Sequence, residues 1–308
     1  MVLDAQPVAK MKHLLIVSDG RKGHENQSVA LAKYLGLPYE VVKIDAAFTG
    51  SKLLGYAGDR LNVHLKNFVP EREIPQRVYS AVIGTGSSTY YAVKYLAKIY
   101  GAKSIVTMLP RGYRYDFDMI FAQEHDNPPK QKNIIEIPAN FAYVEPQGIY
   151  RAYGRSVGIV IGGNNGVFTF DVETLRRQLD SIVARYSGYE IAVTTSPRTP
   201  VEIEELVTSY GFDYEVIYSK KPVNPIPDLL AQCETVFITA DSTSMISEAV
   251  SYGKANVEVL PLQSSKENKF DRFIIQLERE GYLHRFDGTV REANRKIDFR
   301  KYLEGMSL

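Results

Sequence analysis

A short apolar run, a turn rich in glycine and polar residues, and a helical stretch follow one another repeatedly along this sequence. In the first such unit, residues 13–17 are a predicted strand that is apolar after His13, 18–25 form a polar turn and 26–35 carry apolar residues at helical spacing. The pattern returns over residues 81–101, and a further series opens near Gly158. Strands alternating with helices are typical of parallel sheets covered by helices on both faces. The sequence therefore predicts an α/β fold built from doubly wound, Rossmann-like sheets.

The chain has 308 residues, which is long for one doubly wound domain and suits two. We expect a disordered lead-in at 1–10, an N-terminal domain over 11–150 and a C-terminal domain over 151–308, divided where proline and glycine interrupt the pattern. Residues 290–308 have the apolar spacing of a helix and are expected to cross back to the N-terminal domain.

The formal net charge is +1, so no global field favours a nucleic-acid partner. The single cysteine, Cys233, cannot form an internal disulfide, and no Cys/His cluster has the spacing of a zinc site. No apolar run is long enough to span a bilayer, and the first residues lack the core of a secretory signal. We expect a cytoplasmic protein, with peripheral membrane association as an alternative, no metal and no transmembrane segment.

The turn at 18–26 combines glycines, basic residues and acidic residues where the first strand ends and a helix begins. Ligands of open parallel sheets bind at this edge, where glycines allow close approach of the backbone. His24 or Asp19 can act as the general base of a reaction. A solvated loop with one capping residue is the alternative interpretation. The other residues expected to contact substrate here are Arg21, Gly23, Glu25 and Asn26.

Two further turns are candidates for substrate contacts. Gly86 and Ser87 precede a helix, where small hydroxyl residues suit an oxyanion but are also ordinary caps. His125 and Asp126 follow the strand predicted at 119–121 and can orient a base or a substrate. Such a pair is more often a hydrogen bond within a loop.

The second series opens with a strand and the turn Gly162, Gly163 and Asn164. A phosphate can rest on the amides of such a turn. The turn is not a dinucleotide fingerprint, because the third glycine and the spaced acidic residue are missing.

The segment 241–248 is the most informative of these turns. Three hydroxyl residues stand where a strand becomes a helix, and Glu248 follows on the same side. Hydroxyls and amides can hold phosphates, and a carboxylate can accept hydrogen bonds from ribose hydroxyls. A capped helix with a solvated Glu248 is the alternative. The residues expected to bind a nucleotide here are Asp241, Ser242, Thr243, Ser244, Met245 and Glu248.

The stretches SDGRKGHENQ at 18–27 and ADSTSMISEA at 240–249 resemble the two signature motifs of the Elm1 family, the mitochondrial fission Elm1-like proteins. Weaker matches at 162–164 and 269–273 extend the resemblance over nearly the whole chain. That family is similar to GT-B glycosyltransferases. The resemblance therefore implies two Rossmann-like domains facing a central cleft.

By the same resemblance, Gly23 and His24 match the acceptor-side glycine loop, residues 242–244 match the donor diphosphate turn, and Glu248 matches the ribose-binding acid. Three functions stay open. The first is a metal-independent glycosyltransferase that needs no cofactor, uses a nucleotide-diphospho-sugar donor and acts on a glycan or a membrane-associated acceptor. The second is a sugar-nucleotide epimerase on the same fold, with Glu124, His125 or Asp126 as an acid/base group. The third is a non-catalytic adaptor.

Overall fold

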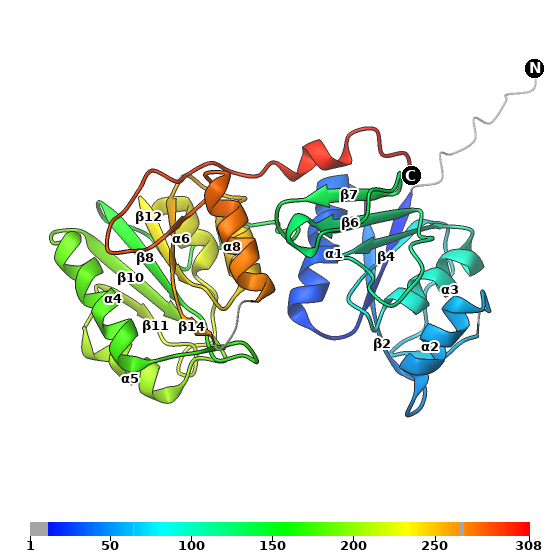
Figure 1. Cartoon of the computed structure of the whole chain (residues 1–308), viewed down its shortest axis with the longest axis horizontal. Helices are drawn as coiled ribbons and strands as arrows, with labels where there is room; N and C mark the ends of the chain where they lie inside the picture. The colour runs from blue at the N-terminus through cyan, green and yellow to red at the C-terminus, as the bar shows by residue number, and fades with distance from the viewer. Residues whose placement is uncertain (1–11, 64, 265–267) are drawn as a thin grey trace, which may run out of the picture. The chain divides into compact units, whose positions relative to one another are not determined.

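The computed structural model describes residues 12–63, 65–264 and 268–308, which fall into two compact units (Figure 1). Unit 1 comprises Met1–Gln123, Asn127–Ile137 and Arg300–Leu308, and unit 2 comprises Glu124–Asp126 and Pro138–Phe299. Contacts thus group residues 138–150, which the sequence division assigns to the first domain, with unit 2. The lead-in expected at 1–10 lies outside the described residues.

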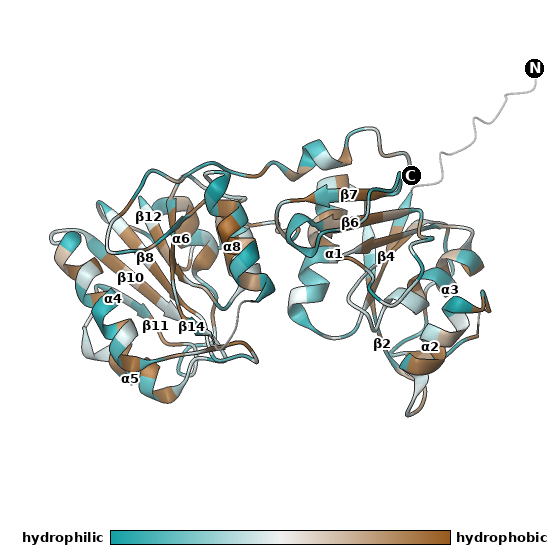
Figure 2. Cartoon of the chain, viewed as in Figure 1, coloured by the Kyte–Doolittle hydropathy of each residue, from teal (hydrophilic) through white to brown (hydrophobic). Residues whose placement is uncertain are grey.

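Unit 1 contains a seven-stranded sheet in the order β3-β2-β1-β4-β5-β6-β7. β3 is antiparallel to β2, and the other neighbouring pairs are parallel. The central strands are buried over most of their length because helices cover both faces (Figure 2). The elements are β1 (His13–Ser18), α1 (Lys22–Leu35), β2 (Tyr39–Ala46), α2 (Ser51–Arg60), β3 (Phe68–Pro70), β4 (Tyr79–Thr85), α3 (Tyr90–Tyr100), β5 (Lys103–Thr107), β6 (Met119–Gln123) and β7 (Ile134–Ile137).

Unit 2 contains a parallel six-stranded sheet in the order β11-β10-β8-β12-β13-β15, and a small antiparallel pair of β14 and β9. The predicted α/β class with two Rossmann-like parallel sheets is confirmed. The elements are η1 (Glu124–Asp126), β8 (Ser156–Ile161), β9 (Phe168–Thr169), α4 (Val172–Arg185), β10 (Glu190–Thr195), α5 (Val201–Ser209), β11 (Tyr214–Val216), α6 (Ile226–Gln232), β12 (Thr235–Thr239), α7 (Thr243–Ala249), β13 (Asn256–Leu260), β14 (Gln263–Ser264), α8 (Lys269–Arg279), β15 (His284–Arg285) and η2 (Phe299–Leu303), which continues into unit 1.

Helix α1 begins at Lys22, earlier than the start at 26 that the sequence predicts. The carbonyl of Arg21 accepts hydrogen bonds from the amides of His24 and Glu25, both at 3.0 Å, so these residues already belong to the first turn. The predicted polar loop is therefore short, and Gly23, His24 and Glu25 lie on the helix.

The helix predicted over residues 290–308 is wrong. This segment is irregular apart from the 3₁₀ helix η2, because its polar groups bond to other elements rather than to one another. Ile297 donates its amide to Val250 at 2.8 Å, and the Lys296 ammonium donates to the carbonyls of Ala249 and Ala255 at 2.8 and 2.9 Å. Burial lowers the pKa of Lys296 to about 8.

A buried carboxylate on α6 holds the segment that leads into β8. Asp228 is 1% exposed. Its two oxygens accept hydrogen bonds from the backbone amides of Gln147, Gly148, Ile149 and Tyr150 at 3.0, 2.9, 2.8 and 3.3 Å. A buried charge is tolerated only when it is hydrogen-bonded in this way.

We predict that Asp228→Ala lowers the free energy of unfolding by about 3–5 kcal/mol, because four backbone amides lose a buried acceptor at once. Urea unfolding followed by circular dichroism measures the change. Glu173→Ala, which removes an exposed carboxylate, serves as the control and is expected to change stability by about 0.5 kcal/mol or less. A loss below about 1 kcal/mol for Asp228→Ala would contradict the role of Asp228 in holding the segment that leads into β8.

Candidate functional site

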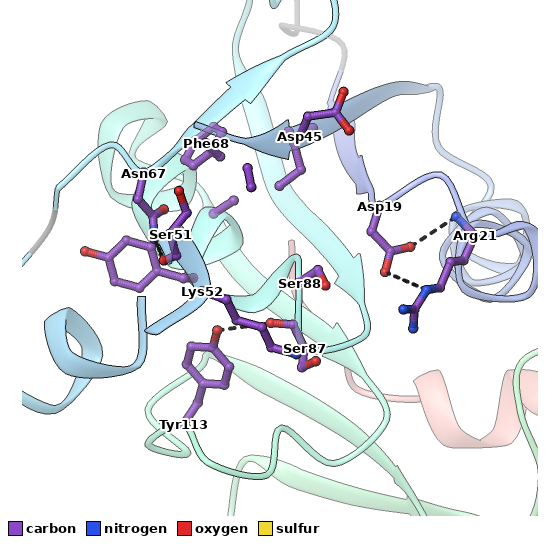
Figure 3. Close-up of a pocket in the computed structure, with 14 residues that line it drawn as sticks. Asp19, Arg21, Asp45, Ser51, Lys52, Asn67, Phe68, Ser87, Ser88 and Tyr113 are labelled. Atoms are coloured by element: carbon purple, nitrogen blue, oxygen red, sulfur yellow. Dashed lines mark hydrogen bonds and ion pairs between the residues drawn. The ribbon is translucent and has the colours of Figure 1, made fainter. Parts of the chain in front are cut away.

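Unit 1 has a pocket of about 320 Å³ at the carboxyl edge of its sheet (Figure 3). Its walls come from the turns after β1 and β4, from the end of β2, and from α2 and α3. The polar residues that line it are Asp19, Arg21, Asp45, Ser51, Lys52, Asn67, Ser87, Ser88, Tyr91 and Tyr113. The mixture of two cations, two carboxylates and several hydroxyls suits a polar ligand.

Asp19 and His24 form a hydrogen-bonded pair beside this pocket. Nδ1 of His24 lies 3.0 Å from Oδ2 and 3.2 Å from Oδ1 of Asp19. The side chain of Asp19 is 7% exposed and that of His24 is 20% exposed. Because a carboxylate accepts and does not donate, it selects the tautomer with hydrogen on Nδ1 and leaves Nε2 as the basic nitrogen.

Gly86 makes room for this histidine. A Cβ at Gly86 would lie 2.4 Å from Nδ1 of His24, and the φ of +90° is in the region that favours glycine. The adjacent Ser87 lines the pocket, and its carbonyl accepts a hydrogen bond from Tyr113 at 3.0 Å.

The other candidates on α1 are placed differently. Glu25 accepts hydrogen bonds from Ser18 at 2.8 Å and Lys22 at 3.1 Å. Burial disfavours its charge, yet these bonds leave the pKa of Glu25 below its ordinary value. The carbonyl of Gly23 accepts from Gln27 within the helix, and Asn26 is exposed on α1. The pocket wall is formed by Asp19 and Arg21 rather than by these three residues.

In unit 2, Asp241 connects three turns at the carboxyl edge of the sheet. Its carboxylate accepts from the amide of Gly163 at 3.0 Å, the hydroxyl of Thr239 at 2.7 Å and the guanidinium of Arg198 at 3.3 Å. Its carbonyl accepts from Asn165 at 3.1 Å. Burial raises the pKa of Asp241, and these hydrogen bonds oppose that effect. The Asp241 side chain is fully buried, so it positions the turns and does not face solvent.

The amides of Gly162 and Gly163 are not free for a phosphate, in contrast to the expectation from the sequence. Gly162 donates to Thr239 at 2.7 Å, and Gly163 donates to Asp241. A Cβ at Gly162 would lie 2.1 Å from Asp241, and one at Gly163 would lie 2.1 Å from the backbone of Arg198. Both glycines thus permit close packing within the protein. Asn164 is exposed, and its side chain accepts the amide of Phe170 at 3.0 Å.

Helix α7 carries the remaining candidates. The hydroxyl of Ser242 caps it by accepting the amide of Met245 at 3.4 Å. Thr243 faces Asn140, whose side-chain amide lies 3.5 Å from its hydroxyl. Ser244 and Glu248 are four residues apart and therefore share one helix face, which is partly exposed.

Glu248 differs from the other acidic residues of this edge. Within the described part of the chain, no hydrogen bond or ion pair reaches its carboxylate. Burial raises the pKa of Glu248 to about 7, with no partner to offset the cost. A partly exposed carboxylate without a hydrogen-bond partner in the protein is suited to accept hydrogen bonds from an incoming ligand.

His125 and Asp126 lie on η1, which belongs to unit 2. The ring of His125 packs edge-on against Phe273 of α8, with centroids 5.1 Å apart, and the neighbouring Glu124 accepts from Gln276 at 2.6 Å. These contacts attach η1 to α8.

Sequence analysis missed Arg198, Lys52 and Tyr113. Arg198 follows β10, the strand next to β8, so the rule that ligands lie at the carboxyl ends of strands already pointed to its turn. Lys52 lies on α2, a helix that was not predicted, and Tyr113 lies in an irregular loop.

Residues 12–63, 65–264 and 268–308 contain neither a metal-binding cluster nor a membrane-spanning helix. No group of three or more His, Cys, Asp and Glu side chains there is arranged to hold a metal ion. No helix there is long and apolar enough to cross a bilayer.

Comparison with protein families gives a match to the family described as mitochondrial fission ELM1 over residues 22–301. An uncharacterized protein of Rickettsia prowazekii (strain Madrid E) is 26% identical, with 79% of this chain and 81% of that protein covered.

Among solved structures, a Listeria monocytogenes protein described as a UDP-N-acetylglucosamine 2-epimerase is similar, with a TM-score of 0.51 and 11% identity. The match covers 96% of this chain and 86% of that one. MurG of Acinetobacter baumannii matches with a TM-score of 0.47 and 12% identity over 89% of this chain and 85% of that one. At such identities the likeness concerns the fold, which is GT-B-like.

We predict that Gly163→Ala lowers the free energy of unfolding by about 3 kcal/mol, because the added methyl group meets backbone that cannot move away. Gly166→Ala is the matched control, since a Cβ there has no neighbour within 4 Å, and is expected to change stability by about 1 kcal/mol or less. Equal stability of the two variants in urea unfolding would show that the turn is looser than described.

We predict that Glu248→Gln stabilises the protein at pH 8 by about 2 kcal/mol and has no such effect at pH 4.5. The ordinary pKa of 4.5 rises to about 7 on folding, so the folded state holds the proton more tightly. The stability that Glu248 contributes is present below pH 4.5 and is lost as the pH rises to 7. Urea unfolding of both proteins at several pH values measures this difference, and a pH-independent difference would rule out the raised pKa.

Proposed function

The chain belongs to the mitochondrial fission ELM1 family, and we propose that it is a metal-independent, inverting glycosyltransferase that uses a nucleotide-diphospho-sugar donor. The GT-B-like fold supports this class of reaction. The observation that carries the proposal is Glu248, a carboxylate without a partner among the described residues, at the edge of the sheet where α/β proteins bind ligands.

In this proposal unit 2 binds the donor. The Glu248 carboxylate accepts hydrogen bonds from two ribose hydroxyls, which also favour its ionised form. Ser244, on the same helix face, donates to a phosphate oxygen. Arg198 is 48% exposed and is held in place by Asp241, so its guanidinium is oriented to balance the diphosphate charge.

Unit 1 binds the acceptor, a hydroxyl of a glycan or of a membrane-associated molecule, in the pocket beside Asp19. Nε2 of His24 removes the proton from this hydroxyl, and Asp19 stabilises the resulting imidazolium. The acceptor oxygen then attacks the anomeric carbon, and the bond to the nucleoside diphosphate breaks. Arg198 and the hydroxyls stabilise the leaving diphosphate, so no metal or other cofactor is required.

A sugar-nucleotide epimerase is the second candidate. Glu124, His125 and Asp126 belong to the same unit as Glu248, so an acid/base group and the donor residues occur on one body. Incubating the protein with the donor alone and analysing the sugar distinguishes the two, because only an epimerase changes the sugar without an acceptor.

Isothermal titration calorimetry with UDP, GDP, CMP and ADP sugars tests the donor site. One of them is expected to bind the wild type, and Glu248→Gln is expected to weaken that binding about tenfold to a hundredfold. Glu173→Gln, on an exposed helix face, is the control and should bind like the wild type. No heat with any donor at millimolar concentration would refute the proposal.

We predict that His24→Ala and Asp19→Asn each lower kcat by about 10² to 10⁴, because the base or its tautomer is lost. The donor Kd should stay within about threefold of the wild-type value. Release of nucleoside diphosphate in the presence of acceptor gives the rate. If both variants, and Glu248→Gln, retain the cellular role in complementation, the chain acts as an adaptor instead.

A further inference from the structure

Helix α2 is inverted relative to an ordinary surface helix. Its buried residues are Ser51, Gly55, Gly58 and Asp59, which are small or polar. Its leucines, Leu53 and Leu54, point away from the core and are 74% and 37% exposed. Surface helices of globular proteins normally bury the apolar stripe and expose the polar one.

The buried face of α2 packs closely against Tyr91 of α3 and against Asn67. A Cβ at Gly58 would lie 2.7 Å from the hydroxyl of Tyr91 on α3, and one at Gly55 would lie 3.1 Å from the side-chain amide of Asn67. Asp59, on the same face, binds Lys94. The inversion is therefore fixed by packing and by a buried ion pair, and it holds the leucines outward.

Apolar exposure continues on both sides of the helix. We call the resulting surface the α2 patch. Its exposed residues are Phe48 (51%), Leu53 (74%), Leu54 (37%), Leu61 (74%), Val63 (43%) and Leu65 (50%). Figure 2 shows the apolar colouring on α2. Six exposed apolar side chains concentrated between residues 48 and 65 are typical of a binding surface.

The exposed charged side chains within residues 46–66 have one sign, and the nearby carboxylate of Asp116, which shares Lys94 with Asp59, is also bound by Arg114. Lys52, Arg60 and Lys66 are exposed, whereas Asp59 is the one acidic residue in the sequence from 46 to 66 and is buried. Outside this stretch, the exposed Asp45 and Glu71 lie 3.8 and 4.0 Å from Lys43, so the two carboxylates share one cation.

We propose that the α2 patch docks unit 1 on an anionic phospholipid bilayer. The leucines enter the boundary between headgroups and acyl chains, and the three basic side chains contact the lipid phosphates, which is how amphipathic helices lie on membranes. The positive charge of Lys52, Arg60 and Lys66 favours this occupant over a second copy of the chain, because two such patches would bring these like charges together. The inference does not depend on the proposed transferase activity.

Co-sedimentation of the full chain with vesicles tests the proposal. Binding to phosphatidylcholine with 30 mol% phosphatidylglycerol is expected to exceed binding to pure phosphatidylcholine by about tenfold or more at 50 mM NaCl, and to weaken at 500 mM NaCl. Leu53→Ser/Leu61→Ser should weaken partitioning about tenfold or more. Arg60→Gln/Lys66→Gln should lose about fivefold per charge on the anionic vesicles alone.

Val201→Ser/Ile275→Ser, which removes two exposed apolar side chains of unit 2, is the matched control and should bind vesicles like the wild type. Thermal unfolding verifies that the variants fold. Absence of wild-type binding, or unchanged binding of the leucine variant, would overturn the proposal. A dimer by light scattering that disappears in the leucine variant would assign the α2 patch to self-association instead.

Discussion

The buried carboxylate of Asp241 is the interaction on which the ligand-binding edge of unit 2 depends. Both carboxylate oxygens of Asp241 accept hydrogen bonds, from Gly163 after β8, Arg198 after β10 and Thr239 at the end of β12. Three segments of the chain therefore share one anion. The glycines at 162 and 163 follow from it, because any side chain there would displace the carboxylate or the backbone of Arg198. Removing a charge from water is costly, and only complete hydrogen bonding makes it tolerable. The shape of the edge is thus set before any ligand arrives.

Four carboxylates in this protein show that the number of hydrogen bonds a carboxylate accepts separates structural groups from candidate binding groups. Asp228 and Asp241 are enclosed and fully bonded, and they fix backbone. Glu248 is only partly exposed and has no partner among the described residues, so its charge is costly in the absence of a ligand. The Asp19–His24 pair of unit 1 lies between these two cases. The Asp19 carboxylate is hydrogen-bonded to Nδ1 of His24, and the histidine stays partly exposed. A charged side chain that lowers the stability of the free protein can regain that free energy when a ligand forms hydrogen bonds with it.

Sequence patterns predicted the regular strands well, because buried parallel strands are short, mostly apolar runs bounded by polar, glycine or proline turns. They also directed attention to Asp19, His24 and Glu248. They failed where tertiary contacts decide the outcome. Helix α2 was missed because its leucines face outward and its inner face contains two glycines, so no amphipathic pattern points to a core. Likewise, residues 290–298 have helical spacing, but their polar groups bond to β13 and α7. The bonding of Gly162 could not be predicted either, since it depends on Thr239, far away along the chain.

Neither unit is one continuous stretch of sequence. Residues 300–308 belong to unit 1, where the carbonyls of Ser307 and Leu308 accept hydrogen bonds from Lys103 and Lys12 and Arg300 lies over the ring of Tyr34. During synthesis the seven strands of unit 1 leave the ribosome first, yet this last piece follows only after all of unit 2 has been translated. A nascent unit 1 therefore exposes the surface around Tyr34 for the whole of that interval, and translation of the second half sets how long it stays incomplete.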